Sequence, residues 1–172
     1  LSNSRIERLS DGFDFSRNEN TINNESDAIG IQQDLGFYLK LDSLGSEWDT
    51  KFGYSFSDNH SEQNYFNVFL LPVNNQINGE GGTDQQRHFF QFQSDLTYRV
   101  HPKIRVETGV KSTLLNNSSQ SAWFYSHGGQ MQPDNRRTSS FSFRERIHSA
   151  YVQGSFSLPA NFVIKTGVRV EN

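Results

Sequence analysis

The chain has 172 residues, which is the length of a single domain. Charges of both signs are interspersed and the formal net charge is −3, so no basic patch marks a nucleic-acid partner. The sequence contains no cysteine, which excludes disulfides and thiolate metal sites.

The apolar and aromatic contents point in different directions. Only 33% of the residues are hydrophobic and the mean hydropathy is −0.72, which is low for the core of a soluble domain. Aromatic residues nevertheless make up 13% of the chain, whereas disordered chains are poor in aromatics. Strands that are apolar on one face only, joined by polar connections, account for both observations. No apolar run approaches the roughly 20 residues of a membrane-spanning helix.

In chain order, a weak strand is expected around Phe13 and Phe15. Clear alternation of apolar and polar residues then predicts further strands. They cover residues 29–41, 47–56, 87–100, 103–114, 139–158 and 161–172. In the strand over residues 139–158 the alternation changes phase, which predicts a β-bulge near His148.

The connections between these strands alternate in length. Long polar loops are predicted at residues 18–26, 57–86 and 116–138, and short turns at residues 42–46, 101–103 and 159–160. Transmembrane barrels sort their connections in this way, with short periplasmic turns at one rim and long extracellular loops at the other. The sequence therefore predicts an all-β antiparallel up-and-down meander of about seven strands, an incomplete segment of a large transmembrane β-barrel. The alternative is a half-buried soluble sheet, such as a carbohydrate-binding β-sandwich.

Three stretches resemble the outer-membrane β-barrel family related to TonB-dependent receptors. They are "YLKLDSLGSEWDTKFGYS", "SDLTYRVHPKIRVETGVKST" and "FSFRERIHSAYVQGSFSLPANFVIKTGVRVEN". The matching positions include a Leu-Asp turn, "VETGVK", and the residues Phe141, Phe143, Glu145, Ala150, Tyr151, Gly167, Arg169 and Glu171. The resemblance extends over most of the chain from about Ile29 onward.

The resemblance implies a barrel in the bacterial outer membrane that imports a nutrient. It also implies a plug domain upstream, and a segment that contacts an inner-membrane energy-transducing complex. Residues 1–172 are expected to be a partial barrel domain, with the plug domain and the barrel termini absent. The expected partners are outer-membrane lipid, the protein's own plug domain and the inner-membrane complex. The remaining alternative within the membrane is a structural or adhesive barrel without active transport.

No motif predicts catalysis, a cofactor or a metal. The five histidines are scattered without metal-ligand spacing. The stretch "GEGGTD" lacks the lysine and the strand-turn-helix context of a phosphate loop, and "SHGGQ" is not a nucleophile elbow. The chain is therefore not expected to be an enzyme.

Two groups of residues are candidates for contacts. Charged residues predicted to face the barrel lumen and contact the plug are Asp95, Arg105, Glu107, Lys165 and Arg169. A predicted extracellular loop that contacts the ligand contains Trp123, Phe124, Tyr125, Arg136 and Arg137, because aromatics stack on rings and arginine binds carboxylate or phosphate. Alternatively, the three aromatics continue a strand.

Overall fold

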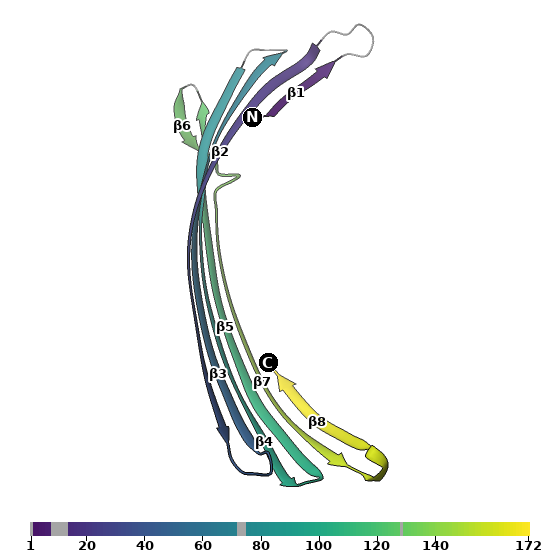
Figure 1. The fold of residues 1–172 in the computed structure, drawn as a ribbon. Coiled ribbons are helices and arrows are strands. Elements are labelled where there is room, and N and C mark those ends of the chain that lie inside the picture. Colours follow the sequence, from purple (N-terminus) through teal and green to yellow (C-terminus); the bar gives the residue numbers. More distant parts are fainter. Residues whose placement is uncertain (1, 8–13, 72–74, 128) are drawn as a thin grey trace. The chain divides into compact units, whose positions relative to one another are not determined.

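The computed structural model describes all residues except 1, 8–13, 72–74 and 128. In the described part nearly all residues are extended (Figure 1). The strands are β1 (Ser2–Glu7), β2 (Asp14–Lys40), β3 (Glu47–Leu71), β4 (Asn75–His101), β5 (Ile104–His127), β6 (Gln130–Pro133), β7 (Ser139–Ser157) and β8 (Val163–Glu171). A single short 3₁₀ turn, η1 (Pro159–Asn161), is described between β7 and β8. No helix in the described part is long and apolar enough to cross a membrane.

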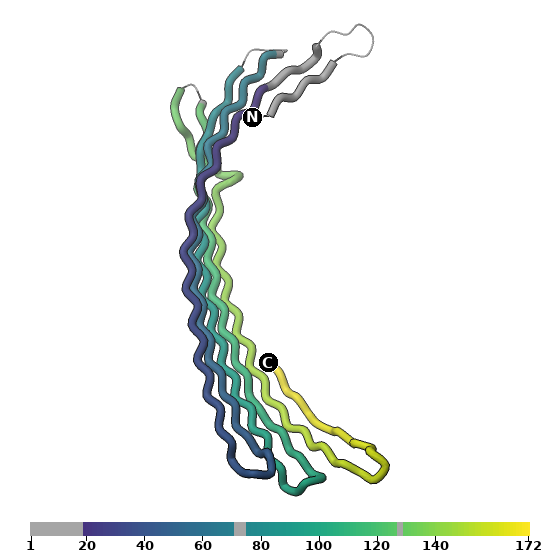
Figure 2. The backbone as a smooth tube through the Cα atoms, viewed as in Figure 1, coloured from purple at the N-terminus to yellow at the C-terminus, as the bar shows by residue number. Residues whose placement is uncertain are grey.

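The strands form one sheet in the order β1-β2-β3-β4-β5-β7-β8, and β6 pairs with β5. Strands that are consecutive on this path therefore lie side by side, as the backbone trace in Figure 2 shows. The pairs β1–β2 and β7–β8 are antiparallel. The predicted antiparallel meander is confirmed.

The chain divides into two compact units, and the long strands pass through both. Unit 1 contains residues 1–29, 58–86 and 118–142, and unit 2 contains residues 30–57, 87–117 and 143–172.

In unit 2 the short turns are tightly built. In the turn between β2 and β3, Oδ1 of Asp42 accepts hydrogen bonds from the backbone N–H groups of Leu44 (2.8 Å) and Ser46 (2.9 Å). Gly45 has φ +94°, which favours glycine. Ser46 is fully buried, and its Oγ accepts a hydrogen bond from the backbone N–H of Arg99 on β4. This hydrogen bond connects the β2–β3 turn to the end of β4.

One face of unit 2 is apolar and open. Aromatic rings lie against each other across its strands, Phe37 with Trp48 at 5.5 Å and Tyr54 with Phe90 at 4.6 Å between centroids. No hydrophobic side chain in the described part is buried, and Val168 and Val170 on β8 are each 70% exposed. An apolar sheet face that no other layer of the described residues covers is typical of a surface that meets lipid or another protein.

The prediction of long loops is wrong, because most of these residues extend the strands. Residues 18–26 lie within β2, residues 57–71 and 75–86 within β3 and β4, and residues 116–127 within β5. Loops were predicted there because these residues do not alternate between apolar and polar. A strand, however, requires only that its backbone N–H and C=O groups pair with a neighbouring strand. Polar side chains then bond across it, as Gln63 to Asn24 (2.8 Å) and Thr83 to Ser121 (2.9 Å) in unit 1.

The predicted bulge near His148 is also wrong. The β7–β8 register runs without a shift over Ser149–Ser157, and reciprocal backbone hydrogen bonds between His148 and Asn172 continue it. The pairing of β7 with β5 is also regular. Ser157 contacts Lys103, and His148 contacts Ser112 nine residues further along both strands, so no residue is inserted between these points. The change of phase in the sequence therefore means that β7 exchanges polar and apolar residues between its faces. For the predicted weak strand, Phe15 lies in β2, and Phe13 is outside the described residues.

Candidate functional site

The charged face of unit 2 is organised around Glu107 on β5. Its carboxylate forms ion pairs with Arg105 and, at 3.7 Å, with Nζ of Lys165 on β8. Gln153 on β7 donates a hydrogen bond to the same carboxylate. The Glu107 side chain is only 14% exposed, whereas Arg105 and Lys165 are 41% and 58% exposed. Both cations therefore keep donors that are available to a further partner.

A second carboxylate, Asp95 on β4, is held on the same face. It accepts hydrogen bonds from the Tyr151 hydroxyl (2.8 Å) and from the side-chain amide of Gln93 (2.6 Å). Between β4 and β7 lies Gly109 of β5, where an added Cβ would overlap Asp95 and lie 2.5 Å from the Tyr151 ring. A strand that lacked a glycine at this point would separate Tyr151 from Asp95.

Arg169, the fifth residue of the predicted set, makes different contacts. Its guanidinium binds Glu171 on the same strand at 2.8 Å and approaches Oγ of Ser149 on β7 at 3.4 Å. The structure thus brings Arg105, Glu107 and Lys165 into contact, and places Asp95 and Arg169 in neighbouring contacts on the same face. Whether these residues contact a plug stays a prediction.

Sequence reasoning did not select Tyr151 or Gln153 as site residues. The signal was present, because Tyr151, Gln153, Lys165 and Arg169 alternate with apolar residues in β7 and β8. The predicted bulge obscured it. Without a bulge, odd-numbered residues of both strands share the charged face.

The predicted ligand loop of unit 1 needs a correction. Trp123, Phe124 and Tyr125 lie in β5, so Phe124 points to the face opposite the other two. This is the alternative in which the aromatics continue a strand. Arg136 and Arg137 follow β6 in a turn, where the backbone N–H of Arg136 binds the Asp134 carboxylate at 3.0 Å.

Arg137 and Trp123 are nevertheless in contact. The Arg137 guanidinium carbon lies 3.5 Å from the centroid of the Trp123 ring and 5.3 Å from that of Tyr65 on β3. Tyr65 was missed because the sequence placed it in a loop. Its pairing with β4 supplies the proximity that the sequence does not show.

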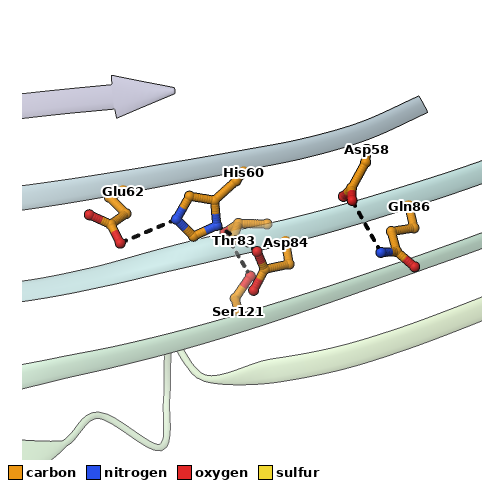
Figure 3. Close-up of polar contacts among 7 residues, drawn as sticks. All are labelled: Asp58, His60, Glu62, Thr83, Asp84, Gln86 and Ser121. Atoms are coloured by element: carbon orange, nitrogen blue, oxygen red, sulfur yellow. Dashed lines mark hydrogen bonds and ion pairs between the residues drawn. The ribbon is translucent and has the colours of Figure 1, made fainter. Parts of the chain in front are cut away.

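The other face of unit 1 holds a cluster of carboxylates around His60 (Figure 3). Nδ1 of His60 lies 2.5 Å from Asp84 on β4, and Nε2 lies 3.2 Å from Glu62. These hydrogen bonds, first to Asp84 and then to Glu62, raise the pKa of His60 above its usual 6.5. Asp27 and Asp58 line the same shallow hollow of about 500 Å³.

Neither the residues around Glu107 nor the carboxylates around His60 form a set of metal ligands. In the ranges outside the undescribed residues, no group of three or more His, Asp or Glu side chains is arranged to hold a metal ion. The contacts around His60 are those of one imidazole between carboxylates.

A comparison with protein families matches residues 39–172 to the model "Outer membrane protein beta-barrel family". The matched range includes all of unit 2 except its first nine residues. The charged face and the short turns lie within the matched range. A comparison with curated proteins finds no match. The all-β meander and the exposed apolar face agree with the family. The chain therefore belongs to an outer membrane protein β-barrel family, and its location is the bacterial outer membrane.

Proposed function

We propose that this chain forms part of the wall of a TonB-dependent receptor-like barrel that imports a nutrient across the outer membrane. The observation that supports this most is the network around Glu107, because its cations retain exposed donors on a charged face. In an open lumen water would satisfy these donors. A plug domain with carboxylates or carbonyls would complete them.

Unit 2 is the proposed membrane-spanning part. A tilted strand crosses a bilayer in about 9–11 residues, so the strand segments of unit 2 are long enough. Its apolar face would contact lipid and its charged face the lumen. The turn that contains Ser46 would lie at the periplasmic rim, and the strand ends in unit 1 would lie outside the cell.

The proposed mechanism gives the barrel a passive role. Solute is captured outside the cell, the inner-membrane complex pulls on the plug, and the plug rearranges while the wall keeps its shape. The wall itself performs no chemical step and holds no cofactor. Polar contacts that are individually weak and many in number suit a plug that must move.

A test of this proposal does not need the solute. The chain has no cysteine, so Lys165→Cys introduces a single thiol into it. We expect the thiol to react slowly with a membrane-impermeant maleimide in energised cells and at a different rate after an uncoupler collapses the proton-motive force. Asn135→Cys, in an exposed turn of unit 1, is the control and should react equally in both states.

The same experiment addresses the second candidate, a structural or adhesive barrel. That candidate is favoured by the finding that Glu107 is already neutralised within the wall by Arg105 and Lys165. Under it, the thiol at position 165 would react at one rate regardless of energisation, as the control does. This result would contradict active import.

A further inference from the structure

Two aromatic rings that pack closely against β4 support the position of Arg137. In unit 1 the Trp123 ring lies over Gly81 of β4, where an added Cβ would sit 2.5 Å from the ring atom Cε3. The Tyr65 ring lies over Gly79 of the same strand. The two glycines thus leave room for rings from β3 and β5 to lie close against β4, and the Arg137 guanidinium lies near both rings.

The backbone fixes Arg137 in this position. The N–H of Asp134 donates to the carbonyl of Trp123 (2.7 Å), and the N–H groups of Arg137 and Thr138 donate to the carbonyl of Asp134 (3.1 and 2.9 Å). The N–H of Trp123 donates to Oγ1 of Thr138 (3.1 Å). The turn is therefore hydrogen-bonded on both sides to the tryptophan that the arginine covers, so the backbone of the turn is ordered before binding.

The charge of Arg137 is not neutralised nearby. The carboxylates on β3 and β4 in unit 1 are Asp58, Glu62, Glu80 and Asp84, all at even positions. Trp123 contacts Gly81, an odd position of β4, so its face of the sheet is the opposite one. Among the described residues, no carboxylate lies within ion-pair distance of the Arg137 guanidinium, and the side chain is exposed. Asp134, the carboxylate of the same turn, accepts the backbone N–H of Arg136. The guanidinium donors of Arg137 are therefore open to an anion from outside the described part of the chain.

We propose that Arg137 binds an oxyanion, the carboxylate or phosphate group of a solute, with Trp123 and Tyr65 as its support. Stacking uses the face of the guanidinium, so the N–H donors in its plane stay free to bind two oxygens side by side. The aromatic rings also shield the site on one side, which strengthens a charge-assisted hydrogen bond. The statement that the anion belongs to an imported solute rests on the proposed uptake function, whereas the anion site itself does not.

Binding is measured on the whole protein in detergent micelles, with pyrophosphate as the probe and constant ionic strength set by chloride. We expect saturable binding that Arg137→Gln weakens by about tenfold or more, the loss of a charge-assisted pair of hydrogen bonds. Arg137→Lys keeps the charge but loses the planar fork, and should weaken binding nearly as much. Arg136→Gln is the matched control and should change the dissociation constant by less than about twofold.

The outcomes separate the site from its role. Equal binding by wild type and Arg137→Gln, equal losses at positions 136 and 137, or no saturable binding by wild type would each overturn the anion site. Repeating the titration with lipopolysaccharide micelles distinguishes a lipid phosphate from a solute, since a solute site should prefer free pyrophosphate. If the site binds pyrophosphate but the thiol at position 165 is insensitive to energisation, the site stands and the import proposal fails.

Discussion

The hydroxyl of Tyr151 on β7 donates a hydrogen bond of 2.8 Å to Asp95 on β4, and it reaches that carboxylate across the backbone of Gly109 on the intervening strand β5. Three strands of unit 2 are joined on their charged face by this contact. It depends on a residue without a side chain at the crossing point.

Gly109→Ala should therefore destabilise the barrel. The added methyl would overlap Asp95 and the Tyr151 ring and lie 3.0 Å from the backbone oxygen of Ser94, so the side chains must separate. We expect a loss of about 1–3 kcal/mol in the free energy of unfolding, the usual cost of overpacking. Denaturant titration of the protein folded into lipid vesicles measures it.

Gly36→Ala is the matched control for this substitution. Gly36 is also a strand glycine of unit 2, and an added Cβ there would have no atom within 4 Å. The variant should be as stable as wild type or more stable by up to about 1 kcal/mol, because alanine loses less entropy on folding. A loss at position 36 equal to that at position 109 would refute the steric explanation.

Ser46→Ala should weaken the attachment of the β2–β3 turn to β4. The hydroxyl of Ser46 is buried and accepts the N–H of Arg99, which the alanine variant leaves without a partner. We expect a loss of about 1–3 kcal/mol in the free energy of unfolding. Ser43→Ala, in the exposed part of the same turn, should be close to neutral, and equal effects at both positions would argue against a role for the hydrogen bond.

The turn also has a pH dependence. Hydrogen bonds from Ser46 to Asp42, with smaller contributions from Leu44 and Gly45, lower the pKa of the Asp42 carboxyl below its usual 3.8. A lowered pKa stabilises the folded turn at any pH above the unfolded value, and this contribution is lost as the pH falls through the folded value. In Asp42→Ala, hydrogen exchange of the Ser46 amide should be faster at neutral pH, and its extra dependence on acid below about pH 4 should be absent.

Period-two alternation predicted the strands of unit 2 because one of their faces is apolar. It failed over residues 57–64 and 75–86, where the residues on both faces of β3 and β4 are mostly polar and strand formation depends on pairing with neighbours. The candidate residues show the same division. Glu107 and Lys165 meet because two regular strands bring them to one face, whereas the Tyr65–Arg137 contact depends on a strand register and a turn that no local pattern reveals.

His60 gives unit 1 a pH dependence of the opposite sign. The groups that face it are Asp84 on β4, Glu62 and Asp58 on β3, and Asp27 on β2, all carboxylates. Because its pKa is raised above 6.5, its contribution to stability is complete below pH 6.5 and is lost as the pH rises through the folded value. Backbone hydrogen exchange around positions 60 and 84, corrected for the intrinsic pH effect, should show opening that becomes easier above pH 6.5. His60→Gln should remove this dependence, and a variant that kept it would assign the effect to another group.

The two faces of β8 are tested by neighbouring residues. Ile164 pairs with Phe156 on the apolar face and is 54% exposed, whereas Lys165 points to the charged face and contacts Glu107. If the apolar face meets lipid, Ile164→Arg places a cation in the bilayer and should cost about 2–4 kcal/mol near the midplane. Lys165→Ala should cost less, because Arg105 still neutralises Glu107.

Val106→Arg and Arg105→Ala on β5 provide a second pair with the same expected contrast. Unfolding from lipid vesicles in denaturant measures all four variants. A tolerated Ile164→Arg with a strongly destabilised Lys165→Ala would mean that the faces are reversed, and two harmless variants would place β8 outside the membrane.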